Sequence, residues 1–192
     1  RKFMGTLWNT YAFFVLYANI DNFDASKYIL EYDKLPVMDK WVLSKLNTTV
    51  GEVDDDLANY RIPEAARALQ EFVDDLSNWF VRRSRRRFWK SEDDADKKEA
   101  YSTLYFVLKY LAVIMAPFTP FLSEELYLKM TGGEEAESVH LLDWPKSCKI
   151  DQKVLDEMAR TREIISEGLA MRMDKETGQI KVRQPLNKFV YG

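Results

Sequence analysis

Apolar residues recur along the middle of this 192-residue chain at alternating intervals of three and four. The clearest run is Leu43, Leu46, Val50, Val53 and Leu57. This spacing places the run on one face of an α-helix, as in the seam of a helix bundle. Gly and Pro number only 7 and 6, which disfavours a turn-rich β fold. The sequence therefore predicts an all-α, antiparallel helix bundle.

Similar patterns predict further helices, separated by polar turns and by Pro or Gly. The expected helices are residues 3–20, 36–58, 62–89, 99–116, 119–131 and 152–173. The fourth is apolar on nearly every side, so it should lie at the centre of the bundle. Between the helices we expect a polar hinge at 91–98 and a strand-like strap at 140–145.

The third expected helix changes character along its length. Its apolar face consists of Ile62, Ala66, Leu69, Val73, Leu76 and Phe80. Extending the same face by three and then four residues reaches Arg83 and Arg87. A helix of this kind can pack at one end and present positive charge at the other.

Residues 78–89 concentrate positive charge in a chain whose net charge is −3. The arginines are Arg82, Arg83, Arg85, Arg86 and Arg87. A guanidinium donates two parallel hydrogen bonds to a phosphate and stays charged, and interleaved aromatic residues favour nucleic acid as the partner. Neighbouring helix positions point in different directions, so two or three arginines would meet phosphates while the rest pair with acids such as Asp74 or Asp75, or with other elements.

The alternative is a solvated helix end whose arginines all pair with nearby carboxylates. Exposed pairs of that sort stabilise a protein by only about 0–1 kcal/mol, so five arginines exceed what stability alone requires. Among the aromatic neighbours, Trp79 suits either the core or a binding surface. Phe88 and Trp89 lie beyond the apolar face and are expected to be exposed, or to pack under a neighbouring domain.

Other kinds of site have little support. A structural zinc site takes about four Cys or His ligands, and the chain has one of each, Cys148 and His140. There is no glycine-rich phosphate loop, and the aspartates at 54–56 are expected to form a solvated face rather than a metal site. No apolar run reaches the roughly 20 residues of a membrane span. We therefore expect no catalytic residue and no bound metal in this chain.

The two ends of the chain are interpreted as cuts through a larger protein. The sequence opens without Met shortly before a helix. It closes on residues 180–182 and 189–191, which alternate like strand residues.

Several motifs resemble those of one protein family. They are LWNTYAFF at 7–14, YANID at 17–21, DKWVLSKL at 39–46, NWFVRRSRRRFW at 78–89, APFTPF at 116–121 and KVRQPL at 181–186. In this order they resemble the helical anticodon-binding domain of isoleucyl-tRNA synthetases. The arginine run is specific to that family, whereas the Ala-Pro-Phe-x-Pro bend is shared with valyl and leucyl relatives.

The resemblance implies a domain organisation and a function. Residues 1–148 would form the anticodon-binding bundle, and 149–192 the sixth helix and the start of a truncated C-terminal α/β unit. The chain would be a non-catalytic tRNA-binding module of an enzyme that joins isoleucine to its tRNA with ATP and Mg. No cofactor is expected in this part. The implied partners are isoleucine tRNA and the catalytic domain and C-terminal region of the same chain, in the cytoplasm and without a membrane.

The resemblance also assigns residues to tRNA. Asn9 and Trp79 would lie near the anticodon, and Lys2 would touch backbone phosphate. The composition of residues 78–89 adds the five arginines and an exposed ring at Trp89 to these candidates. Two alternatives stay open at this point. The bundle could be a structural brace between synthetase domains, or the equivalent module of a valyl- or leucyl-tRNA synthetase.

Overall fold

The computed structural model describes residues 2–89, 94–132 and 136–173, together with 181, 183, 184 and 190. It divides into two compact units, Arg1–Ile150 and Asp151–Gly192. Within these described ranges the regular structure is entirely helical, as the sequence predicts.

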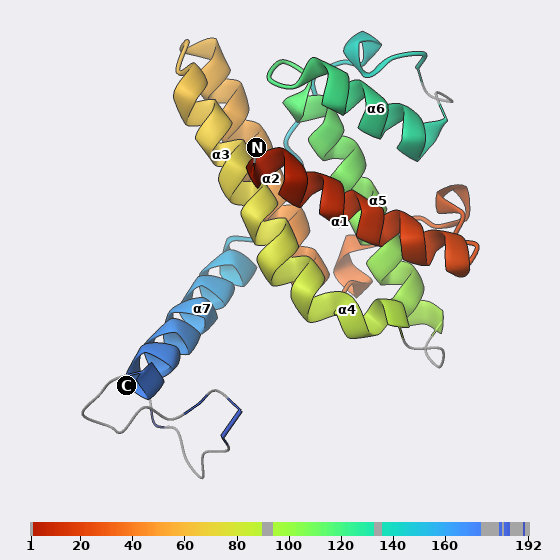
Figure 1. Cartoon of the computed structure of the whole chain (residues 1–192). Helices are drawn as coiled ribbons and strands as arrows, with labels where there is room; N and C mark the ends of the chain where they lie inside the picture. The colour runs from red at the N-terminus through yellow and green to blue at the C-terminus, as the bar shows by residue number, and fades with distance from the viewer. Residues whose placement is uncertain are drawn as a thin grey trace. The chain divides into compact units, whose positions relative to one another are not determined.

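The first unit contains six α-helices among its described residues (Figure 1). They are α1 (Lys2–Ile20), α2 (Val37–Ala58), α3 (Ile62–Asp75), α4 (Arg82–Trp89), α5 (Asp94–Met115) and α6 (Pro120–Thr131). A π-helical segment, η3 (Leu76–Val81), joins α3 directly to α4, and the three form one continuous bent ribbon in Figure 1. Short 3₁₀ turns are η1 (Ala25–Lys27), η2 (Tyr32–Lys34) and η4 (Val139–Leu141). The second unit contributes α7 (Gln152–Met173).

Local sequence explains where several helices begin and end. Pro63 and Pro120 occupy first-turn positions, where the missing N–H is not needed. Gly132 closes α6 with a φ of 65°, a left-handed conformation that favours glycine.

The core of the first unit is built around α5, which packs against α2, α4, α6 and α1. Its fully buried apolar side chains include Leu104, Val107, Leu108, Leu111, Ala112 and Ile114. On α2, the predicted seam is buried at Leu43, Leu46, Val50 and Val53, with Leu57 half-buried. The central helix and the bundle seam are therefore confirmed.

The predicted apolar face of the third helix is confirmed from Leu69 to Phe80 but is wrong at its N-terminal end, and the core does not end at Phe80 as expected. Ile62 and Ala66 are exposed, and the buried positions of α3 are Ala65, Leu69, Phe72 and Val73. Beyond η3, the buried residues are Ser84 and Phe88 rather than Arg83. Phe88 is only 1% exposed, so its expected exposure is also wrong.

Three further expectations concern the connections. The expected hinge at 91–98 is helical from Asp94 onward, where α5 begins, and its first residues lie outside the described ones. The expected strap at 140–145 begins in the 3₁₀ turn η4 instead of a strand. The strand-like pattern that suggested a C-terminal α/β unit falls at 180–182 and 189–191, largely outside the described residues.

None of the helices in the described ranges is both long enough and apolar enough to cross a membrane.

Candidate nucleic-acid interface

The π-helical segment determines which way α4 faces. Leu76, Phe80, Ser84 and Phe88 are all buried although they are four residues apart. In a regular α-helix, three such steps would rotate the side chains by about 120° in total. A π turn adds about one residue per turn and so corrects most of that drift. The segment therefore keeps Ser84 and Phe88 in the core, while Arg82, Arg83, Arg85, Arg86 and Trp89 are exposed.

The outward side of α4 carries Arg82, Arg86 and Trp89. Successive residues of an α-helix are about 100° apart, so these three fall within roughly 60° of one another, on the side away from Ser84 and Phe88. All three are exposed, Trp89 by 55%. The outward side thus combines two guanidinium groups with an indole ring.

One flank of α4 lies against aromatic residues of α1. The Phe13 ring meets the Phe88 ring at 5.1 Å and lies 5.7 Å from the Arg85 guanidinium carbon. One turn further along α1, the Tyr17 ring lies 6.4 Å from the Trp89 ring. Arg85 is exposed. A cation–π contact of this kind, worth about 0.5–1 kcal/mol at an exposed site, aligns Arg85 without using its hydrogen-bond donors.

At the other flank of the cluster, Arg83 stacks on Trp79 of η3. The guanidinium carbon lies 3.8 Å from the indole centre. Trp79 is half-buried and Arg83 is exposed. A stacked guanidinium keeps its planar N–H edge available for an anionic acceptor such as a phosphate.

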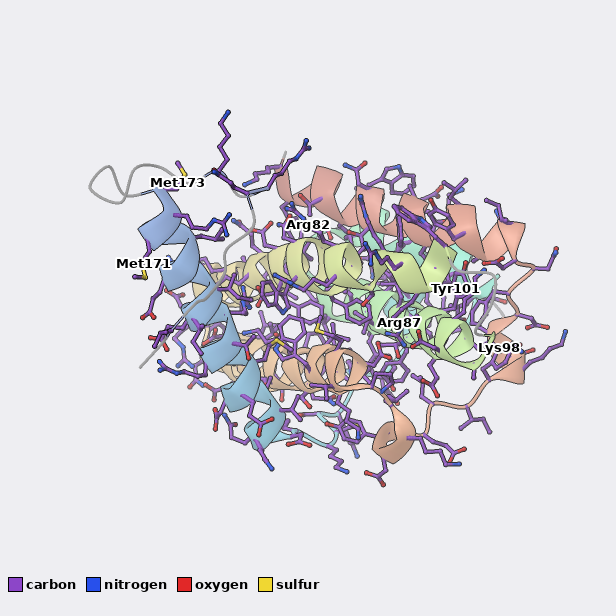
Figure 2. The ribbon with its side chains drawn as sticks, turned by 90° about the horizontal axis from the view of Figure 1, so that it is seen from below. Arg82, Arg87, Lys98, Tyr101, Met171 and Met173 are labelled. Carbon is purple, nitrogen blue, oxygen red and sulfur yellow. The ribbon has the colours of Figure 1, made fainter. Side chains whose placement is uncertain are left out.

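Arg87 differs from the other four arginines because it points inward. It lies about 140° around the helix axis from Arg82, and Figure 2 shows the two on opposite sides of the helix. Its Nη1 and Nη2 donate to the two carboxylate oxygens of Asp39 at 2.8 and 2.7 Å. Its Nε donates to Asp96 at 2.6 Å.

Burial is the dominant influence on Asp39, whose side chain is 0% exposed, and it raises the pKa of that carboxyl against the opposing effect of Arg87. Burial also opposes charge on Arg87, but hydrogen bonds and attraction from Asp39 and Asp96 outweigh it and raise the pKa of Arg87. The guanidinium therefore stays protonated at this junction of α2, α4 and α5.

No ion pair joins Arg82, Arg83, Arg85 or Arg86 to a carboxylate within the part of the chain that the structure describes. The expected pairing with Asp74 or Asp75 is thus absent for these four. Their positive charge is therefore not neutralised by an ion pair within the described residues.

The two candidates on α1 share one face with Phe13. Lys2 and Asn9 are separated by two turns, and Asn9 and Phe13 by one. Lys2 and Asn9 are both exposed. Because Phe13 meets α4, this face of α1 borders the arginine cluster, which brings residues of the first and fourth helices to one side of the bundle.

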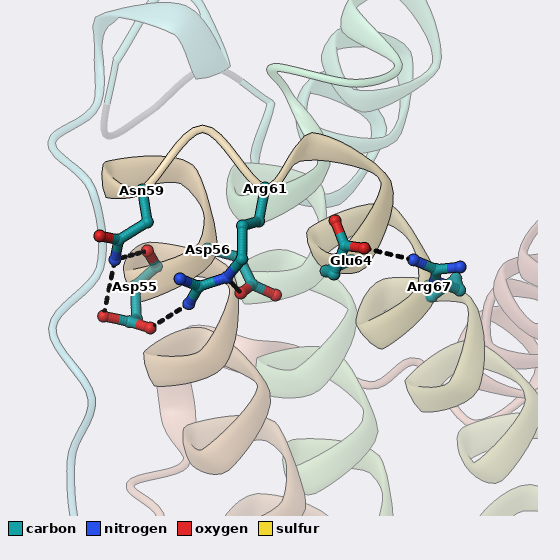
Figure 3. A network of polar contacts seen from close by, with 6 residues as sticks. All are labelled: Asp55, Asp56, Asn59, Arg61, Glu64 and Arg67. Atoms are coloured by element: carbon teal, nitrogen blue, oxygen red, sulfur yellow. Dashed lines mark hydrogen bonds and ion pairs between the residues drawn. The ribbon is translucent and has the colours of Figure 1, made fainter.

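Two of the three aspartates at 54–56, Asp55 and Asp56, are engaged away from the arginine cluster. Arg61 donates to Asp55 and Asp56 at the α2–α3 turn, where Glu64 also pairs with Arg67 (Figure 3). No cluster of three potential metal-ligating His, Cys, Asp or Glu residues occurs in the described ranges. This turn is therefore a local network of ion pairs.

Sequence reasoning missed Asp39, Asp96, Phe13 and Tyr17 as neighbours of the arginines. Asp39 lies in the first turn of α2, where an acidic residue is ordinary because it favours the helix dipole. A buried carboxylate needs a cationic partner, but the sequence offers no local sign of Asp39's burial.

The chain belongs to the anticodon-binding domain of tRNA ligases, whose family pattern matches residues 39–189. Among curated proteins it is 48% identical over 191 residues to an isoleucine–tRNA ligase of Dehalococcoides mccartyi and 46% identical over 195 residues to one of Clostridium tetani. An isoleucine–tRNA ligase of Porphyromonas gingivalis is 44% identical over 187 residues.

These alignments cover 97%, 99% and 97% of this chain respectively, but only 18%, 18% and 16% of the relatives. The chain therefore spans less than a fifth of the length of the relatives that it matches.

Proposed function

We propose that this chain is the anticodon-arm-binding module of an isoleucine–tRNA ligase, and that α4 binds the tRNA backbone. The observation that carries the proposal is the set of four exposed arginines on α4 without a carboxylate partner in the described ranges. The names of the relatives support the choice of isoleucine tRNA.

The arrangement suggests different roles for the candidate residues. Arg82 and Arg86, on the outward side, bind phosphates. Arg85 and Arg83 are held against aromatic rings at the two flanks and add contacts there. The remaining direct contacts are assigned to Trp89, Trp79, Asn9 and Lys2. Arg87 acts indirectly, because its donors are engaged by Asp39 and Asp96.

The wider assignments follow from the relatives' printed names and the sequence motifs. In the proposed whole enzyme, isoleucine is joined to tRNA with ATP and Mg, in the cytoplasm, by parts of the protein beyond this module. Residues 1–148 are the binding bundle, and 149–192 hold α7 and the start of a C-terminal α/β unit. The catalytic domain and the C-terminal region are the partners within the same protein.

The test is the salt dependence of binding to an isoleucine tRNA transcript. Each phosphate contact releases counterions and contributes about 0.7–0.9 to the slope of log K against log salt. The double variant Arg82→Ala/Arg86→Ala should lower the slope by about 1.5 and weaken binding at low salt. A matched control, Arg61→Ala/Arg67→Ala, removes the same charge from the network in Figure 3 and should leave the slope unchanged.

Equal slopes for the two double variants would overturn the phosphate assignment. No binding by the unaltered chain even at low salt would instead support a bracing role for the bundle. Equal affinity for isoleucine and valine tRNAs would contradict the assignment to isoleucine tRNA.

A further inference from the structure

A buried acid, Asp39, contacts α4 on the side facing away from Arg82 and Arg86. Asp39 of α2 is fully buried, and both of its carboxylate oxygens accept hydrogen bonds from Arg87. Asp96 of α5 accepts from Nε of the same guanidinium through its side chain and from Nη2 through its carbonyl oxygen. One arginine thus joins three helices at a single point.

The π turn sets the direction in which α4 faces, and these contacts restrain rotation of α4 about its own axis away from it. The helix is only eight residues long, and its other inward anchors are the small Ser84 and the ring of Phe88. Apolar contacts tolerate some rotation, whereas a bidentate guanidinium–carboxylate pair requires one orientation of the fork. Since Arg87 lies about 140° from Arg82, fixing one fixes the direction of the other.

We propose that Asp39 is a positioning residue for tRNA binding: through Arg87 it holds α4 at the rotation that turns Arg82, Arg85 and Arg86 outward. The inference rests on the proposed function and adds a residue that does not touch tRNA. It assigns to Asp39 a part in binding an anion although Asp39 is itself negatively charged.

The negative charge of Asp39 makes the inference testable. Removing the carboxylate of Asp39 raises the net charge of the chain from −3, which by long-range attraction alone should strengthen binding to RNA. If Asp39 positions the arginines, the same change should weaken binding. The two explanations therefore predict opposite directions.

The experiment compares Asp39→Asn with Asp56→Asn in the whole 192-residue chain, using an isoleucine tRNA transcript. Asp56 pairs with Arg61 at the α2–α3 turn, so its replacement changes the net charge equally without touching Arg87. We expect Asp39→Asn to reduce affinity about five- to tenfold at low salt and to lower the salt slope by about one, corresponding to one phosphate contact. Asp56→Asn should keep the wild-type slope and bind equally well or slightly more tightly.

Circular dichroism and thermal unfolding establish that each variant is folded before binding is measured. Should Asp39→Asn not fold, Asp96→Asn serves as the second variant. The side chain of Asp96 is 34% exposed, and its replacement leaves the Asp39–Arg87 pair intact. We expect a smaller loss of affinity, about two- to threefold, again with a lowered slope.

A folded Asp39→Asn chain with the wild-type slope would overturn the inference. If Asp39→Asn does not fold, an unchanged slope in Asp96→Asn would overturn it instead. The proposed function fails separately, when Arg82→Ala/Arg86→Ala leaves the slope unchanged. A lowered slope in that double variant, together with a normal slope in Asp39→Asn, would refute the positioning role alone.

Discussion

At the scale of single residues, adjacent positions on α4 have opposite environments. Phe88 is 1% exposed, and its ring makes edge contacts with Phe13 at 5.1 Å and Tyr101 at 5.0 Å. Trp89, the next residue, is 55% exposed. An aromatic cluster formed by α1, α4 and α5 thus supports the helix that bears the arginines. The ring of Phe88 makes most of the apolar contact between α4 and the core.

We predict that Phe88→Ala and Trp89→Ala differ strongly in stability. Truncation of a buried Phe removes its transfer free energy and leaves a cavity, so the first variant should lose about 3–5 kcal/mol of unfolding free energy. Trp89→Ala removes a largely exposed ring and should cost under about 1 kcal/mol. Urea denaturation measures both. Similar losses in the two variants would contradict this description of α4's attachment.

At the scale of helices, hydrophobic periodicity was sufficient to predict the buried face of some elements but not of others. The seam of α2 and the burial of α5 follow from local spacing, because each is a regular helix with one consistent environment. The π turn at 76–81 has no such signal, since the three–four spacing continues as far as Phe80 and the shift appears only in Ser84 and Phe88.

For the candidate site, the cluster of arginines was visible in the sequence but their separation into outward and inward groups was not. That separation depends on the π turn and on an acid 48 positions away, at Asp39. Contacts between distant positions cannot be read from local patterns in one sequence. The same limit explains why the pairing of Phe13 with Arg85 was missed.

Deletion of Asn78 tests the role of the π turn. Asn78 is exposed within the segment, and removing one residue would restore a regular α-helix and rotate α4 by about 100°. Phe88 and Arg87 would then lose their partners, so we expect a loss of about 2–5 kcal/mol in unfolding free energy and a lowered salt slope for tRNA. The control Asn78→Ala retains the residue count and should change neither quantity appreciably. Wild-type stability in the deletion variant would show that the π turn does not set the orientation of α4.

At the scale of the whole bundle, the C-terminal end of α1 is joined to α5 by a polar cluster. Asp21 accepts a hydrogen bond from the Tyr101 hydroxyl at 2.5 Å and pairs with Lys97 at 2.6 Å. Residues 80 positions apart are thereby linked. Because α1 also supplies Phe13 and Tyr17 beside α4, this link helps hold the two helices of the candidate interface together.

The charge on Asp21 should make this link dependent on pH. Burial alone would raise the pKa of Asp21, but hydrogen bonds from Lys97 and Tyr101 outweigh it and lower that pKa below the ordinary value of 3.8. The unfolded chain therefore binds a proton at a higher pH than the folded one. It follows that the contribution of Asp21 to stability is complete above the unfolded pKa and is lost as the pH falls through the lower, folded pKa.

We predict that Asp21→Asn lowers the unfolding free energy at pH 7 by about 1 kcal/mol and that the difference from wild type shrinks toward zero below pH 3.8. Taking the difference between the two proteins removes the opposing contribution of Asp39, whose pKa is raised in both. The measurement is urea denaturation from pH 7 down to about pH 3, the region in which a lowered carboxyl pKa acts. A difference that stayed constant into the acid range, or grew there, would show that Asp21 acts through its shape and not through its charge.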